Sequence, residues 1–213
     1  MTSENEAVME QAHSAPHVHR DDEGSKMGMW LFLFTEVLLF GGLFVLYAGY
    51  RFAYSDGFVA AASEMNTFIG AINTIVLLTS SLSVALSIAA VQKGHKRLTM
   101  NLLWFTLICG LAFLVNKYFE WSHEIHNGIY PRGPALDNMS QGEVIYFGLY
   151  YTMTGLHGLH VIVGMIFIGF VMNFISRDII TRNNFQKLEN AGLYWHLVDL
   201  IWIFLFPLFY LIH

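Results

Sequence analysis

The sequence predicts an all-α membrane protein, a bundle of five transmembrane helices with its N-terminus in the cytoplasm and its C-terminus outside. The 213 residues are 55% hydrophobic and 13% charged, whereas soluble domains usually have about 25% charged residues. A single soluble core of this size could not bury so many apolar side chains. The lengths of the apolar stretches predict the number of helices, and the distribution of basic residues predicts their direction.

Five apolar stretches are each long enough to cross about 30 Å of hydrocarbon, which takes a helix of about 20 residues. They cover about residues 27–50, 66–91, 98–121, 143–174 and 193–212. The fourth stretch is long enough to tilt or to extend beyond the bilayer. Apolar residues run continuously instead of alternating with polar ones, which favours helices over strands.

Polar and turn-forming residues separate the stretches, and the chain shows neither a separate soluble domain nor an internal repeat. Residues 1–26 are polar and are expected to form a flexible tail. Residues 27–213 are expected to form one transmembrane domain that contains all five helices.

Lysine and arginine residues determine the predicted orientation. With five crossings, eight basic residues fall on the side of the N-terminus: Arg20, Lys26, Lys93, Lys96, Arg97, Arg177, Arg182 and Lys187. Two fall on the other side, Arg51 and Arg132, while Lys117 lies inside the third stretch. Because cytoplasmic loops hold an excess of lysine and arginine, the N-terminus is predicted to lie in the cytoplasm.

Glu36 lies inside the first apolar stretch, in the sequence FTEVLLF (34–40), as the only ionisable residue between Lys26 and Tyr47. Its neighbours one helical turn away are all apolar: Phe32, Leu33, Leu39 and Phe40. A charged carboxylate at this depth is costly. We therefore expect Glu36 to be protonated and hydrogen-bonded to another helix, with proton relay as the alternative.

The third stretch ends in the polar sequence NKYFEWSHEIH (116–126). Asn116, Lys117 and Glu120 are three or four residues apart and can share one helix face. Aromatic residues in this segment are also typical of an interfacial belt. We interpret Lys117 and Glu120 as members of a structural polar network.

Histidines and one aspartate lie in the last two stretches. His157 and His160 are three residues apart in TGLHGLHVIVG (154–164), and His196 and Asp199 are three apart near the start of YWHLVDLIW (194–202). Polar residues in membrane helices usually hydrogen-bond to one another. We expect these four residues to pair between helices.

Two other classes of function remain open from these residues alone. Histidines on facing helices could ligate haem, which would make the chain a stand-alone haem enzyme. Intramembrane carboxylates and histidines also occur in proton-coupled transporters, although the chain lacks the repeated halves and interrupted helices of many transporters. The single cysteine, Cys109, excludes an intrachain disulfide and any site that needs two thiolates, and no metal site is expected.

Five segments together resemble subunit III of the haem–copper oxidases. They are GMWLFLFTEVLLFGGLF (28–44), INTIVLLTSSLSV (72–84), YFEWSH (118–123), TGLHGLHVIVG (154–164) and LYWHLVDLIWIFLFPLFYL (193–211). The resemblance covers about residues 25–212 and is to the short, five-helix bacterial form of cytochrome c oxidase subunit 3. The mitochondrial form has two additional helices at its N-terminus.

The resemblance implies a multi-pass subunit of the bacterial inner membrane without redox centres, whose haem and copper lie in partner subunits. The implied partners are the catalytic subunit I, subunit II, a small subunit IV and membrane lipids, with bound phospholipid and no nucleic acid. The implied role is to support assembly, lipid binding, proton uptake and the lifetime of the catalytic subunit.

The resemblance also assigns residues. Glu36 stands at the position of the carboxyl that reacts with hydrophobic carbodiimides, facing a lipid cleft or the catalytic subunit. The interhelical network or lipid cleft would include Glu120, Lys117, His157, His160, His196 and Asp199. Lys117 departs from the family, in which this position is often glutamine.

The electron donor stays open between cytochrome c and quinol. Glu36 and the sequence YFEWSH favour the cytochrome c oxidase type. Subunit III of a quinol oxidase and an accessory subunit of a nitric oxide reductase are the alternatives within the family.

Overall fold

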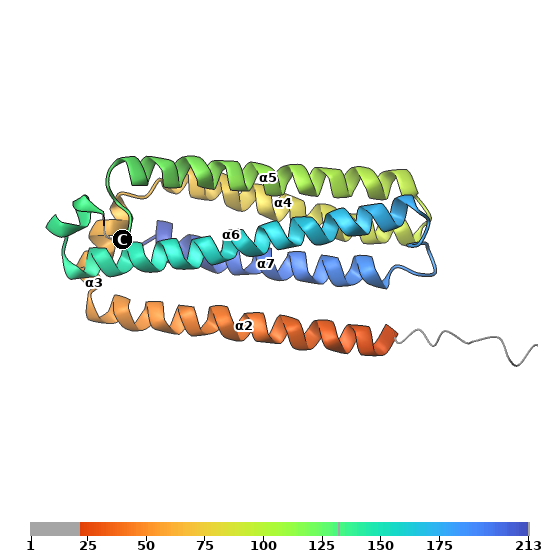
Figure 1. The fold of residues 1–213 in the computed structure, drawn as a ribbon, viewed down its shortest axis with the longest axis horizontal. Coiled ribbons are helices and arrows are strands. Elements are labelled where there is room, and N and C mark those ends of the chain that lie inside the picture. Colours follow the sequence, from red (N-terminus) through yellow and green to blue (C-terminus); the bar gives the residue numbers. More distant parts are fainter. Residues whose placement is uncertain (1–21, 132, 213) are drawn as a thin grey trace, which may run out of the picture.

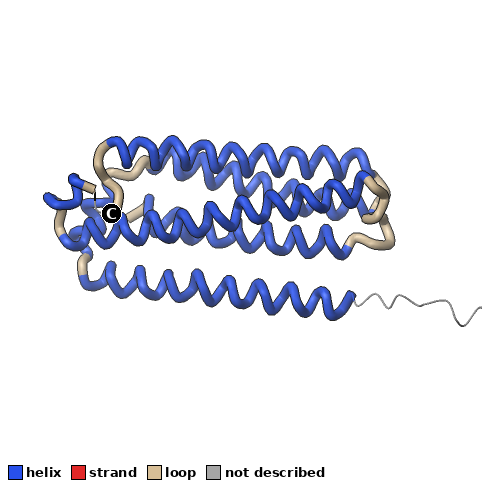
Figure 2. The backbone as a smooth tube through the Cα atoms, viewed as in Figure 1, coloured by secondary structure: helices blue, strands red, loops and turns tan. Residues whose placement is uncertain are grey.

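The computed structural model describes residues 22–131 and 133–212 of the chain. Within these residues all regular structure is helical (Figure 1), and Figure 2 shows that short loops join the helices. The elements are α2 (Asp22–Ala53), α3 (Ser55–Ser63), α4 (Thr67–Gln92), α5 (Lys96–His126), the 3-10 helix η1 (Pro134–Asn138), α6 (Gln141–Ser176) and α7 (Gln186–Tyr210). Five helices of the described part are long and apolar enough to cross a membrane, which confirms the predicted all-α five-helix bundle.

The helices are longer than the apolar stretches that predicted them. Helix α2 begins at Asp22 rather than at about 27, so the last residues of the expected tail are helical, while residues 1–21 lie outside the described residues. Helix α7 begins at Gln186 rather than at about 193. Hydropathy detects only the part of a helix that lies in hydrocarbon, and polar helix formers such as Lys187 and Glu189 extend it. Asp199 consequently lies near the middle of α7.

Helix α3 occupies a segment that the sequence predicted to be a connection. Its nine residues are too few to cross a bilayer, and Phe58, Ala61 and Ala62 are buried against the bundle. In Figure 1, α3 lies at the same end of the bundle as the C-terminus. This end, which also holds the α5–α6 connection, is called the α3 end below, and the end that holds the start of α2 is called the opposite end.

Side chains satisfy the free backbone groups at several helix ends. Ser140 and Glu143 form a capping box at the start of α6, with each side chain accepting a hydrogen bond from the other residue's backbone N–H. The Asn66 side chain accepts hydrogen bonds from two backbone N–H groups at the start of α4. The last carbonyls of a helix lack partners within it, and at the end of α7 the Tyr146 hydroxyl donates to the Phe209 carbonyl at 2.5 Å.

The helices differ in how much of their surface the bundle covers. Helix α4 packs most extensively against α5, and α6 packs against α7. In the most apolar part of α7, 50% of the residues are buried, compared with 11% in α2. Figure 1 accordingly shows α2 at the edge of the bundle. Helix α2 therefore keeps most of its apolar surface free for lipid or another subunit.

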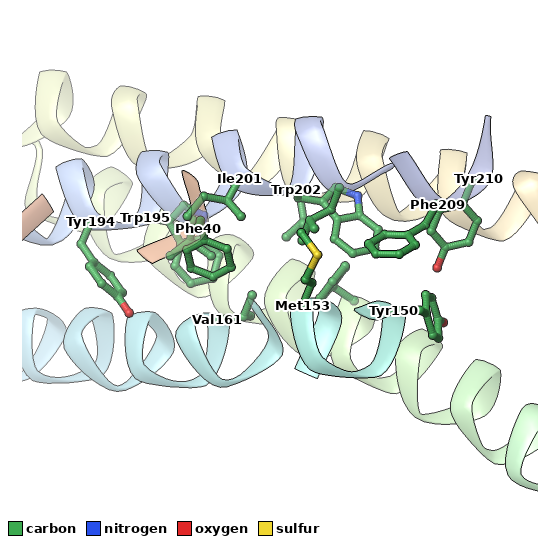
Figure 3. Packing of buried hydrophobic residues seen from close by; sticks show 14 of the residues in the cluster. Phe40, Tyr150, Met153, Val161, Tyr194, Trp195, Ile201, Trp202, Phe209 and Tyr210 are labelled. Carbon is green, nitrogen blue, oxygen red and sulfur yellow. The ribbon is translucent and has the colours of Figure 1, made fainter. Parts of the chain in front are cut away.

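Aromatic side chains fill the interior between α6 and α7. Trp195, Trp202 and Tyr150 are all essentially inaccessible to solvent. Figure 3 shows Trp202 beside Met153, with Tyr150 and Tyr210 further along toward the end of α7. This core positions the polar groups described next.

Candidate functional site

Glu36 of α2 contacts His160 of α6 near the middle of both helices. The distance between Glu36 Oε2 and His160 Nε2 is 2.9 Å, and the two side chains are 14% and 13% exposed. The other ring nitrogen, Nδ1, lies 2.7 Å from the Leu156 carbonyl oxygen. The partner that α2 itself cannot offer to Glu36 thus comes from the neighbouring helix.

These contacts limit the hydrogen-bond roles that the two side chains can take. A carbonyl oxygen can only accept, so Nδ1 of His160 carries a hydrogen. In neutral imidazole Nε2 is then the acceptor, and a protonated Glu36 donates to it. If the proton moves to Nε2, the pair becomes imidazolium and carboxylate with the same total charge. The pair can therefore hold one proton at either atom without changing its net charge.

Aromatic rings surround the Glu36–His160 pair. The rings of Phe40 and His160 meet edge to face at 5.3 Å between centroids, and the Tyr194 hydroxyl donates to the His160 carbonyl at 3.2 Å. Phe32 stacks on Tyr194 at 5.9 Å. Figure 3 places Phe40 and Tyr194 at the same end of the labelled core. The low polarity of these rings strengthens the hydrogen bond within the pair.

Lys117 and Glu120 form a second polar group, nearer the α3 end. Both residues are buried, with 6% and 8% of their surface exposed. Lys117 Nζ donates at 2.9 Å to three oxygens: Glu120 Oε1, the Tyr150 hydroxyl and the Tyr210 hydroxyl. Both tyrosine hydroxyls also donate to Glu120 Oε1. These four residues are called the Lys117 cluster.

The Lys117 cluster compensates a lysine that would otherwise be an unpaired buried charge. The ion pair with Glu120 balances the charge, and three acceptors match the three N–H donors of an ammonium group. Lys117 Nζ also lies 4.8 Å from the centre of the Tyr150 ring and 5.6 Å from that of Trp202, which adds cation–π attraction. Within the described residues the second oxygen of Glu120, Oε2, has no hydrogen-bond partner.

His157 lies between these two groups on α6 and is fully buried, with 0% of its surface exposed. Its ring contacts Phe113 at 5.4 Å and Trp202 at 5.2 Å between centroids. Neither Nδ1 nor Nε2 has a hydrogen-bond partner among the described residues. Although three residues apart on one helix, His157 and His160 therefore have different surroundings.

His196 and Asp199 of α7 do not join either group. His196 Nδ1 lies 2.6 Å from the Ser81 hydroxyl of α4. Asp199 is 2% exposed, and neither of its carboxyl oxygens has a hydrogen-bond partner among the described residues. The structure thus divides the predicted polar residues into the Glu36–His160 pair, the Lys117 cluster, and the separate positions of His157, His196 and Asp199.

Further carboxyl groups lie between the Lys117 cluster and the α3 end. Glu124 follows Glu120 by one turn of α5 and is 7% exposed. Glu64, at the end of α3 and outside the five spans, is exposed. Its pKa is raised, first by partial burial and second by the negative charge of Glu143.

Sequence reasoning missed Tyr150 and Tyr210 as polar partners of Lys117. Tyr150 precedes His157 by seven residues and Tyr210 follows Asp199 by eleven, spacings that return to the same face of a helix. That periodicity could have placed both tyrosines on interior faces. It could not have shown that α5 brings Lys117 between them.

In the described part of the chain, no three His, Cys, Asp or Glu side chains lie together in an arrangement that could hold a metal ion.

Comparison with known proteins finds a matching family profile and several similar proteins. The family profile described as "Cytochrome c oxidase subunit III" matches residues 4–213. Cytochrome c oxidase subunit 3 of Alkalihalophilus pseudofirmus is 33% identical over 185 residues, which cover 87% of this chain and 85% of the relative. Cytochrome bo(3) ubiquinol oxidase subunit 3 of Pseudomonas putida is 30% identical over 197 residues, covering 91% and 88%.

A third relative is longer than this chain. The heme-copper oxidase subunit I+III of Aeropyrum pernix is 30% identical over 195 residues, covering 88% of this chain and 22% of the relative.

Proposed function

The chain belongs to the cytochrome c oxidase subunit III family, and from this we propose that it is the subunit III of a respiratory cytochrome c oxidase. As a family member it is a multi-pass membrane protein and a subunit of a haem–copper oxidase, an oxidoreductase complex, and it associates with the catalytic subunits. The observation that carries the proposal is the match of the family along residues 4–213, which includes all five spans.

We propose that the chain packs directly against subunit I in a bacterial inner membrane. The Aeropyrum pernix relative, by its name, combines subunits I and III, which supports direct contact between these two. Subunit II, a small subunit IV and phospholipid are the further proposed partners. The apolar surface of α2, which includes Trp30, Phe34 and Val45, is exposed and is suited to lipid or to a subunit.

The proposed role is non-redox, with haem and copper bound by the partner subunits. The chain would support assembly, lipid binding, proton uptake and the lifetime of the catalytic subunit. The Glu36–His160 contact supports a part of this role, because it is a polar link between the weakly packed helix α2 and the rest of the bundle. Loss of this link would loosen the surface that α2 presents.

A quinol oxidase is the second candidate. The ubiquinol oxidase relative is 30% identical over 91% of this chain, close to the 33% of the cytochrome c oxidase relative. The two types differ in the electron donor, which is cytochrome c for one and quinol for the other. Subunit III residues alone therefore give little discrimination.

Purification through an affinity tag on this chain in mild detergent tests the proposal. We expect haem-containing partner subunits to copurify, and oxygen consumption to start with reduced cytochrome c. Oxygen consumption with quinol and none with cytochrome c would establish the second candidate instead. Recovery of the chain without any haem-containing partner, or haem bound stoichiometrically to the chain alone, would contradict the proposed function.

A further inference from the structure

A groove of about 330 Å³ opens between α2, α4 and α7 at the opposite end of the bundle. None of its lining residues belongs to the Glu36–His160 pair or to the Lys117 cluster. Its walls include Lys26 and Trp30 of α2, Ile88 of α4, and Glu189, Leu193 and His196 of α7. This feature is called the opposite-end groove.

The opposite-end groove lies where a headgroup layer meets hydrocarbon. Lys26 and Glu189 are the last Asp, Glu, Lys or Arg residues before the apolar stretches that begin at about 27 and 193. Trp30 follows Lys26 by one turn, and tryptophan is typical of the membrane interface. His196 lies two turns beyond Glu189, or about 10 Å deeper at 1.5 Å per residue. The groove thus has a charged mouth and runs inward through the interfacial layer, which is about 5–8 Å thick on each side of the hydrocarbon.

The mouth of the groove contains one positive and one negative charge. Lys26 Nζ and Glu189 Oε2 are 3.8 Å apart, and the two side chains are 54% and 29% exposed. This distance exceeds the about 2.7–3.2 Å of a hydrogen bond, so both groups can still form hydrogen bonds to a ligand. A ligand with an anionic and a cationic group can therefore contact both residues.

Hydrogen bonds between α2 and α7 hold the mouth in this shape. Asn190 Nδ2 donates to the Ser25 hydroxyl of α2 at 3.1 Å, and Gln186 Nε2 donates to Asn190 Oδ1 at 3.0 Å. These contacts fix the first turns of both helices beside Lys26 and Glu189. A site that is already formed loses little conformational freedom when it binds a ligand.

His196 supplies a polar atom at the inner end of the groove. Its Nδ1 lies 2.6 Å from the Ser81 hydroxyl, while its Nε2 has no hydrogen-bond partner in the part of the chain that the structure describes. Leu200 and Ile203 follow on the same face of α7 at steps of four and three residues, and both are exposed. An apolar chain can therefore continue from the groove along α7.

We propose that the opposite-end groove binds phosphatidylethanolamine, a phospholipid with a phosphate and a primary ammonium group. The phosphate contacts Lys26, and the ammonium donates hydrogen bonds to Glu189. His196 Nε2 faces the ester groups, and an acyl chain lies along Leu200 and Ile203. This inference gives the phospholipid of the proposed function a chemical class and a place, and it rests on that function for the choice of the complex as the sample.

The charges of the mouth explain why this headgroup is preferred. A choline headgroup has no N–H group to donate to Glu189, whereas an ethanolamine headgroup can form a charge-assisted hydrogen bond. The glycerol headgroup of phosphatidylglycerol has no cation, so its lipid would leave only a negative charge near that carboxylate. The groove should therefore select ethanolamine over both.

Photo-crosslinking with a lipid tests the site. Phosphatidylethanolamine that has a diazirine in one acyl chain is added in mixed micelles to the complex purified through this chain. Mass spectrometry after irradiation measures the label on the peptide that contains Leu200 and Ile203. Unlabelled phosphatidylethanolamine, phosphatidylcholine and phosphatidylglycerol with the same acyl chains serve as competitors.

In the wild type, phosphatidylethanolamine should compete at least about fivefold better than either of the other lipids. Glu189→Gln should reduce the preference over phosphatidylcholine to less than about twofold, because the ammonium loses its charged partner. Lys26→Gln should weaken labelling about fivefold or more and keep the preference, because the phosphate is common to all three lipids. The two variants thus separate headgroup selection from phosphate binding.

Lys187→Gln is the matched control. Lys187 is an exposed cation of the same first turn of α7, but its ammonium lies 4.5 Å from the centre of the Phe174 ring of α6 and not in the groove. The variant should label and compete like the wild type. All three substitutions are at side chains that are partly or largely exposed, so each variant should fold.

Equal competition by phosphatidylethanolamine and phosphatidylcholine in the wild type would overturn the proposal. Wild-type labelling of Lys26→Gln, or an equal loss in Lys187→Gln, would do the same. Label on a partner subunit and none on α7 would show that a protein covers the groove instead of a lipid. The proposed function fails in a different way, by the absence of haem-containing partners from the preparation, whereas the label is measured on this chain's own peptide.

Discussion

Glu36 illustrates how a single costly residue is accommodated in a membrane helix. Its own helix offers only apolar neighbours, yet His160 supplies a hydrogen-bond partner from α6 at 2.9 Å. The Leu156 carbonyl orients the histidine by accepting from Nδ1, which leaves Nε2 as the acceptor for a protonated carboxyl. The same logic of compensation applies to Lys117, whose charge is balanced by Glu120 and whose three donors all have acceptors.

Replacement of Glu36 by glutamine should preserve the link to α6. The glutamine amide can donate to Nε2 of His160 as the protonated carboxyl does, so Glu36→Gln should assemble almost normally. Glu36→Ala removes the partner of Nε2 of His160 and creates a small void, at a cost of about 1–3 kcal/mol. Yield and thermal stability of the purified complex measure both effects, and equally poor assembly of the two variants would contradict this explanation.

Replacement of the charged members of the Lys117 cluster should be non-additive. Glu120→Gln alone leaves a buried ammonium without its counterion, which costs about 3–5 kcal/mol, and Lys117→Met alone leaves Glu120 uncompensated. The double variant Lys117→Met/Glu120→Gln has no buried charge and should recover most of the loss. The midpoint of thermal unfolding of the complex reports this coupling. A double variant as unstable as the sum of the two single variants would show that the two residues act independently.

Helix α3 shows how a short element depends on close backbone contact. It has nine residues, too few to be stable alone, and it is held where Gly57 meets Gly142 of α6. A Cβ atom added at Gly57 would lie 2.8 Å from the Gly142 Cα and 3.0 Å from the Glu143 backbone nitrogen. Since both of these are backbone atoms, neither can move aside as a side chain would.

Gly57→Ala should therefore destabilise the bundle by about 1–3 kcal/mol. Gly148→Ala is the matched control, because Gly148 lies within α6 and a Cβ atom there meets nothing within 4 Å. The control should be neutral or stabilise by up to about 1 kcal/mol, as alanine is the better helix former. Thermal unfolding of both variants in the same detergent makes the comparison, and an equal effect of the two would remove the close contact as the explanation.

The bundle as a whole combines four well-packed helices with one at the edge. Helix α4 packs against α5 and α7, and α6 packs against α7 and α5, whereas α2 leaves large apolar side chains exposed along its length. This arrangement suits a subunit that completes its packing within a larger membrane complex. It also places the Glu36–His160 pair and the Lys117 cluster inside the chain itself, between helices α2, α5, α6 and α7.

The predicted orientation can be tested with single cysteines. Asn138, in η1 at the α3 end, and Lys93, in the α4–α5 connection, are both exposed, and the native Cys109 is buried. If the excess of basic residues at the opposite end marks the cytoplasm, an impermeant thiol reagent added to intact cells should label Asn138→Cys and spare Lys93→Cys. Labelling of Lys93→Cys alone would show that the orientation is the reverse of the predicted one.

Composition and hydropathy alone determined the fold class and the five spans, because crossing a bilayer requires a long apolar helix whatever the rest of the chain does. The same reasoning singled out Glu36, His157, His160 and Lys117, since polar groups in hydrocarbon are conspicuous in a sequence. The hydropathy analysis missed helix α3 and the early start of α7, because hydropathy does not detect helical residues outside hydrocarbon.

Only the tertiary structure decided which polar residues meet. Glu36 and His160 are 124 positions apart, and Lys117 and Tyr210 are 93 apart, so no local pattern connects them. The rotation of each helix about its axis chooses among the possible partners, and the packing of aromatic side chains between helices sets that rotation. Residues three apart on a helix point about 60° away from each other. The rotation of α6 therefore gives His160 a carboxyl partner and leaves His157, one turn away, among aromatic rings.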